Sequence, residues 1–93
     1  MTVQCLHMGL EPSRTIQGHD AHRISHYKCN GKTNQSWTVF EITDYLMFRN
    51  GYKNMCLLTW PSGIFAIDCK VAELYPQARF NYLTTVGLVP QIP

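Results

Sequence analysis

Charged residues are scarce in this chain. Asp, Glu, Lys and Arg make up 15% of its 93 residues, whereas an average soluble protein has about a quarter. The formal net charge is only +2, which is too small to indicate a nucleic-acid-binding protein. No apolar run approaches the length of a membrane span, so we expect no membrane partner. The N-terminus carries no basic and then apolar leader, so a secreted form would have lost its signal peptide.

Several motifs of catalysis and metal binding are also missing. The chain contains no Cys-x-x-Cys, which argues against a zinc ribbon or a thioredoxin-like redox pair. It has neither a glycine-rich phosphate loop nor a Gly-x-Ser-x-Gly nucleophile elbow. We therefore expect no cofactor and no enzyme activity.

The length allows a single domain, residues 1–93, and such a short chain buries only a limited core. A covalent staple is common in domains of this size, and four cysteines could supply two: Cys5, Cys29, Cys56 and Cys69. Two disulfides would indicate an oxidising compartment. Four cysteines allow three complete pairings, and the sequence does not choose among them.

Alternating and turn-forming residues predict strands over much of the chain. Turn residues are found at Asn30-Gly31 and Pro61-Ser62-Gly63, the second inside a predicted hairpin. The expected strands are Val3–Met8, His22–Cys29, Asn54–Trp60, Ile64–Asp68 with a continuation over Lys70–Leu74, and Arg79–Val86, followed by an extended tail over 89–93.

The segment Asn34–Met47 can be interpreted in two ways. Val39, Ile42 and Leu46 share one helical face, and Asn50-Gly51 could end a helix. Threonine, valine, isoleucine and aromatics instead favour strands, and 36–42 alone could be one. The length of the segment favours the helix, so we expect residues 36–48 to be mainly helical with Val39 in the core. The predicted fold is α+β, one helix packed on a small antiparallel sheet, with an all-β sandwich as the alternative.

A cluster of possible zinc ligands lies in the N-terminal third. Three histidines and a cysteine fall within eleven residues: His19, His22, His26 and Cys29. On a strand, His26 and Cys29 would point to opposite faces. Surface histidines and a structural cysteine are therefore the favoured interpretation, and zinc binding is the alternative.

Residue types suited to RNA cleavage are also present. Such cleavage needs a general acid, a general base and a cation for the phosphate. The candidates are Glu41, Glu73, His22, His26, Arg23, Arg49 and Arg79, and no spacing assigns them to one site.

The string Tyr27-Lys28-Cys29-Asn30-Gly31, the helical segment and Asn50-Gly51-Tyr52 together resemble a family of secreted effectors of powdery mildew fungi. These are the RNase-like proteins associated with haustoria, and the resemblance covers about residues 24–52. It implies the fold of small fungal guanyl-specific ribonucleases without a catalytic set in most members. It also implies delivery into plant cells and recognition by plant immune receptors in some cases.

In this interpretation Tyr27 and Cys29 are structural motif residues. The family usually pairs this cysteine with one near the C-terminus, whereas the last cysteine here is Cys69. We expect Cys29 to pair with Cys69.

Three functions remain open at this point. The first is a secreted fungal virulence effector that binds a host plant protein or immune receptor, with at most weak affinity for RNA. The second is an active small ribonuclease, and the third is an intracellular or viral interaction module that binds zinc. A minority of exposed aromatics would form the partner surface in the first case.

Overall fold

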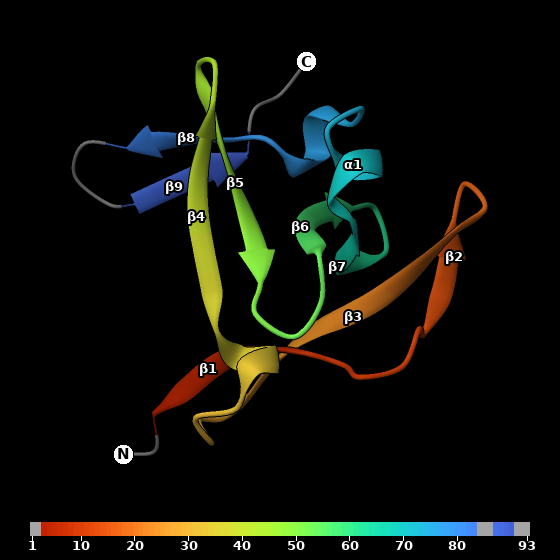
Figure 1. The fold of residues 1–93 in the computed structure, drawn as a ribbon, viewed down its shortest axis with the longest axis vertical. Coiled ribbons are helices and arrows are strands. Elements are labelled where there is room, and N and C mark those ends of the chain that lie inside the picture. Colours follow the sequence, from red (N-terminus) through yellow and green to blue (C-terminus); the bar gives the residue numbers. More distant parts are fainter. Residues whose placement is uncertain (1–2, 84–86, 91–93) are drawn as a thin grey trace.

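The computed structural model describes residues 3–83 and 87–90, and more than half of these residues lie in antiparallel strands (Figure 1). Nine strands belong to one sheet, and the helical segments between them are short. The strands are β1 (Gln4–Met8), β2 (Arg14–Ile16), β3 (His19–Lys28), β4 (Trp37–Ile42), β5 (Tyr45–Asn50), β6 (Met55–Trp60), β7 (Gly63–Asp68), β8 (Phe80–Leu83) and β9 (Gly87–Pro90). The helical segments are η1 (Thr33–Gln35), α1 (Cys69–Ala72) and η2 (Pro76–Ala78).

The sheet is branched at two strands. Its main path runs β1-β3-β7-β6-β5-β8-β9, while β2 pairs with β3 and β4 pairs with β5. The sheet also bends, so that the start of β4 lies beside β1 (Figure 1). There the indole Nε1 of Trp37 donates a hydrogen bond of 3.1 Å to the carbonyl oxygen of Leu6. Two strands that are remote in the pairing order are thereby brought together.

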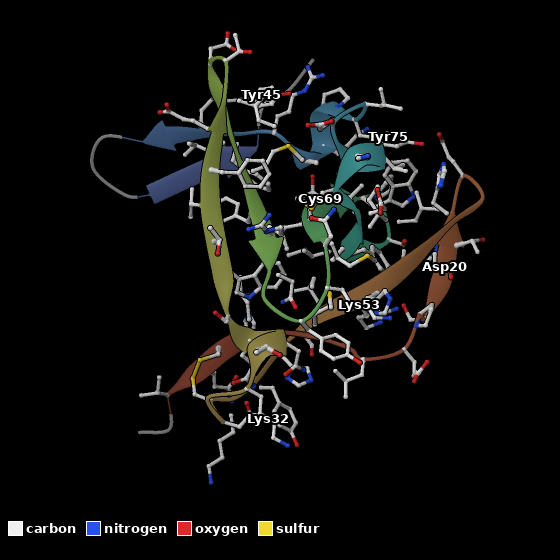
Figure 2. The ribbon with its side chains drawn as sticks, in the orientation of Figure 1. Asp20, Lys32, Tyr45, Lys53, Cys69 and Tyr75 are labelled. Atoms are coloured by element: carbon white, nitrogen blue, oxygen red, sulfur yellow. A yellow bond between two sulfur atoms is a disulfide. The ribbon has the colours of Figure 1, made fainter. Side chains whose placement is uncertain are left out.

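Apolar side chains are buried on both faces of this sheet. One face packs against α1 and η2, and Figure 2 shows Tyr45, Cys69 and Tyr75 on that side. Its buried residues are Ile16, Ala21, Met47, Cys56, Leu58, Phe65, Ile67, Cys69, Ala72 and Ala78. The second cluster lies on the opposite face and consists of Met8, Ile24, Leu46, Met55, Leu57, Ala66 and Phe80, with Trp37 and Phe48 packed against it.

The expected helix over residues 36–48 is wrong, because this segment is the β4–β5 hairpin. Its register pairs Trp37 with Asn50 and Ile42 with Tyr45, which leaves Thr43-Asp44 as a two-residue turn. Thr43 takes a positive φ of 56° at that turn. Turns of this kind usually carry Gly or Asn, so a threonine gave no signal that the chain reverses there. Val39 is 48% exposed rather than buried in a core.

The predicted α+β, ribonuclease-like class is therefore wrong. In the part of the chain that the structure describes, no helix is long enough to form a layer on the sheet. The helix α1 spans only Cys69–Ala72. The sandwich-like arrangement, with apolar clusters on both faces, fits the all-β alternative. Thr, Val, Ile and aromatic residues in β4 and β5 thus followed their strand preference.

Most other strands agree with the sequence-based expectation. The hairpin around Pro61-Ser62-Gly63 is confirmed as β6–β7, and β1 and β3 fall within or around their predicted ranges. The continuation over Lys70–Leu74 is wrong, because Asp68 caps α1 by accepting bonds from the amides of Lys70 and Val71. Strand β8 occupies part of the predicted Arg79–Val86, whose residues 84–86 lie outside the described part. β9 forms at the start of the predicted tail, and residues 91–93 also lie outside it.

All four cysteines are paired, but in a different order from the one expected. Cys5 bonds to Cys29 and Cys56 bonds to Cys69, so the predicted Cys29–Cys69 pair is wrong. The first bridge ties β1 to the end of β3, and the second ties β6 to the start of α1. Two disulfides in a domain of this size are typical of extracellular proteins.

Candidate functional site

An apolar groove of about 400 Å³ opens on the face opposite α1. Its volume is within the range of ligand pockets in proteins. Five strands contribute its walls, and every lining side chain is apolar: Leu6 from β1, Trp37 and Val39 from β4, Phe48 from β5, Leu57 from β6 and Phe80 from β8.

Strand alternation explains why these residues share a face. Trp37, Val39 and Glu41 are two residues apart on β4, so their side chains point to the same side. The register places Val39 opposite Phe48 on β5 and Glu41 opposite Leu46. Thr38 and Phe40 point to the other side, where Phe40 packs against the cluster that contains α1 residues.

Aromatic packing and one hydrogen bond fix the shape of the groove. The rings of Phe48 and Phe80 meet edge to face with centroids 5.2 Å apart. The hydrogen bond from Trp37 to Leu6 fixes the indole at the junction of β4 and β1. Leu6 and Val39 are 40% and 48% exposed, so the groove is open to solvent at these two residues. Its floor is buried, because Leu57 and Phe80 belong to the second apolar cluster.

A smaller acidic cavity of about 110 Å³ adjoins the groove at Phe80. Glu41 at the end of β4 and Asp44 in the following turn line it, together with Tyr45, Leu46 and Asn81. Neither carboxylate makes a hydrogen bond or an ion pair with another described residue. An apolar surface and two unpaired negative charges thus stand next to each other.

The other face of the β4–β5 hairpin carries a basic hollow of about 350 Å³. Thr38, Arg49, Tyr52 and Lys53 line it, and the Lys53 ammonium lies 5.6 Å from the centre of the Tyr52 ring. Two cationic side chains, Arg49 and Lys53, gather in it. A general base is missing from its lining, which otherwise holds only Asn50, Gly51 and Asn54.

The residue types for RNA cleavage are not brought together. Glu41 and Arg49 point to opposite faces of the hairpin, since Glu41 pairs with Leu46 and Arg49 pairs with Thr38. Glu73 and Arg79 are in contact, but an Arg79 Nη donates to the Glu73 backbone carbonyl oxygen and not to its carboxylate.

The remaining members of that set lie on β3. His22 is 2% exposed and its Nδ1 is 2.7 Å from the Gly9 carbonyl oxygen. Arg23 stacks over the Phe65 ring at 5.4 Å, while His26 is exposed opposite Leu6.

The possible zinc ligands do not converge either. Within the described residues, no group of three or more His, Cys, Asp or Glu side chains is placed to hold a metal ion. Cys29 is bonded to Cys5 and lacks the free thiolate that zinc needs. His22 is buried against Gly9 and His19 sits at the far end of β3 from Cys29.

Tyr27 and Cys29 of the Tyr-x-Cys motif both contact residues of β1. Cys29 bridges to Cys5, and Tyr27 stacks on His7 with ring centroids 4.7 Å apart. Both contacts fasten β1 to β3. Tyr27 is nevertheless 55% exposed, so its ring also remains available at the surface.

In comparisons with known proteins, no family model matches the chain, no curated protein matches it and no solved structure matches it. These comparisons do not bear on the resemblance to the mildew effectors, which stays a prediction. Among the described helices, none has the length and apolar character needed to cross a bilayer.

Sequence reasoning missed the groove because its residues are scattered from Leu6 to Phe80. The helix predicted over residues 36–48 includes Trp37, Val39 and Phe48 and places Val39 in the core, so it leaves no groove there. The alternation of Trp37, Val39 and Glu41 within a run of strand-forming residues was the available signal.

Proposed function

We propose that this protein acts outside the cell as a binding domain and that a partner protein docks in the apolar groove. The observation that carries the proposal is a pocket-sized depression lined only by apolar side chains, two of which, Leu6 and Val39, are exposed. Exposed apolar surface of this kind marks interaction sites in soluble proteins. Trp and Phe in its walls are typical anchors of such interfaces.

Location outside the cell is supported by the disulfides. Both pairs join cysteines within the described domain, and no described cysteine is free. Cytosolic reductants would keep such thiols reduced in most organisms. Secretory expression followed by intact mass measurement, with and without reductant, tests this part. A protein that carries two disulfides should gain the mass of the corresponding hydrogens on reduction.

The groove is tested with a neutral fluorescent probe, N-phenylnaphthylamine, whose emission rises in apolar surroundings. We expect saturable binding by the native protein and clear weakening in Val39→Asp, which places a charge on the groove wall. Thr38→Asp is the matched control, because Thr38 is exposed on the same strand and points to the opposite face. Equal probe binding by both variants would contradict the proposed site.

The more specific role of a fungal virulence effector recognised by a plant immune receptor remains part of this proposal. It is supported by the Tyr-x-Cys resemblance and the disulfides, without the ribonuclease-like fold. Cell death on co-expression with a matching receptor would support it. Guanosine-specific RNA cleavage that is lost in Glu41→Gln or His26→Ala would overturn it in favour of an enzyme.

A further inference from the structure

The second edge of β4 borders the groove and carries no strand partner in the described part of the chain. β4 pairs with β5 along one edge only, and β1, across the groove, pairs only with β3. Contact between the two strands is made by the Trp37 side chain at the start of β4. An open edge presents unpaired amide and carbonyl groups, which is a template for an added strand.

We propose that the groove binds an extended peptide segment that adds to β4 as an antiparallel strand, with apolar side chains in the groove and a lysine or arginine beside Glu41. This inference rests on the proposed function and specifies its partner. The three β4 residues on the groove side are, in order, Trp37, Val39 and Glu41. An added strand presents its alternate side chains to the same face.

The register of such a strand defines the motif that it must carry. Read from its N-terminus, an antiparallel ligand meets Glu41 first, then Val39, then Trp37. Residues directly opposite each other in neighbouring strands make the closest side-chain contacts. From its N-terminus, the ligand sequence is therefore a cationic residue, any residue, an apolar residue, any residue and a second apolar residue.

Charge selects this ligand over a purely apolar one. The Glu41 and Asp44 carboxylates line the cavity that joins the groove at Phe80, and neither has a described partner. A cationic side chain opposite Glu41 would complement both charges. Arg79 lies over the ring of Tyr45, a lining residue of this cavity, at 4.9 Å from the ring centre, and no basic side chain is among the residues that line the cavity.

The test uses a capped peptide, acetyl-Ser-Lys-Thr-Val-Thr-Leu-Ser-amide, and its reversed sequence as a control of identical composition. Isothermal titration calorimetry should show binding of the first peptide and markedly weaker binding of the second. Tighter binding of the reversed peptide would overturn the antiparallel register. Absence of binding by either peptide, with N-phenylnaphthylamine still bound, would sink this inference and leave the groove proposal standing.

Two further comparisons test the contacts. Glu41→Gln should lower the affinity for the lysine peptide by about two- to fivefold, the usual contribution of an opposite-charge cross-strand pair. The same substitution should leave unchanged a peptide in which glutamine replaces lysine. Val39→Asp should abolish binding and the milder Val39→Thr should weaken it, while Thr38→Asp should bind like the parent.

Backbone hydrogen bonding between the peptide and β4 can be tested separately from the side-chain contacts. N-methylation of the peptide amides that face β4 should abolish binding, and methylation of the alternate amides should be tolerated. The outward amides of β4 should exchange hydrogen more slowly in the complex. Tolerance of both methylated sets, or unchanged exchange in β4, would show that side chains alone hold the peptide and would overturn strand addition.

Discussion

Thr43 holds its backbone in the left-handed region, with φ at 56°, although its branched side chain disfavours that region. We predict that Thr43→Gly raises the free energy of unfolding by about 1 kcal/mol, since glycine adopts this conformation without steric cost. The urea midpoint measures the change. Thr38→Gly is the control, because Thr38 lies on the same hairpin without a positive φ and its replacement should destabilise.

The exposure of Val39 distinguishes the observed hairpin from the predicted helix, which would have buried this side chain. A core valine replaced by aspartate would cost several kcal/mol, but a valine that is 48% exposed on an edge strand should cost less than about 1 kcal/mol. Met47, which is fully buried in the same hairpin, provides the contrast. Met47→Asp should prevent stable folding. Equal losses in the two variants, measured by thermal melting, would contradict this assignment.

At the scale of elements, the β4–β5 hairpin is fastened to the segment before it. The Gly51 amide donates to the Ser36 carbonyl oxygen at 2.7 Å, and the Asn50 side-chain amide donates to the Asn34 carbonyl oxygen at 3.0 Å. A Cβ at Gly51 would lie 3.0 Å from the Thr33 oxygen and 3.2 Å from the Ser36 Cβ. A larger residue at position 51 would therefore force the neighbouring backbone to shift.

We predict that Gly51→Ala lowers the free energy of unfolding by about 1–2 kcal/mol, because the neighbouring backbone must shift to admit the methyl group. Gly9→Ala is the matched control. Its Cβ would lie 3.6 Å from the nearest atom, an ordinary contact, and Gly9 has no positive φ. Chemical denaturation should show a clear loss in the first variant and a small one in the second. Similar losses in both would contradict the close approach at Gly51.

The elements differ in how well the sequence predicted them, and turn chemistry explains the difference. Pro61-Ser62-Gly63 marks the β6–β7 hairpin with residues that favour turns, so both strands were predicted. Thr43-Asp44 carries no such signal. Apolar residues on both sides of β4 and β5 serve two clusters, which blurs the alternation of a strand and imitates a helical stripe.

The candidate site was less predictable than the strands, for a related reason. A groove made from five strands can be recognised only once the pairing of those strands is known, and its residues Leu6 and Phe80 are far apart in the chain. The Cys5–Cys29 bridge has the same character, because it depends on β1 lying beside β3.

At the scale of the whole molecule, the two disulfides should contribute similarly to stability. They close loops with sequence separations of 24 and 13 residues, for which chain entropy predicts about 3 kcal/mol each. We predict that Cys5→Ser with Cys29→Ser, and separately Cys56→Ala with Cys69→Ala, each lower the free energy of unfolding by about 2–4 kcal/mol. Denaturation curves of the two double variants check this. A loss near zero for either pair would show that its cross-link adds little beyond the packing around it.

The order of those bridges along the chain has a consequence for biosynthesis. Each cysteine bonds to its neighbour in sequence, so the two covalent loops neither overlap nor enclose one another. Shorter loops close at a lower entropic cost, which favours this arrangement over the other two pairings even before the sheet has formed. In the proposed extracellular protein, the first bridge could close during translocation before the second pair of cysteines has emerged. Oxidative maturation should therefore proceed in chain order and need little help from a disulfide isomerase.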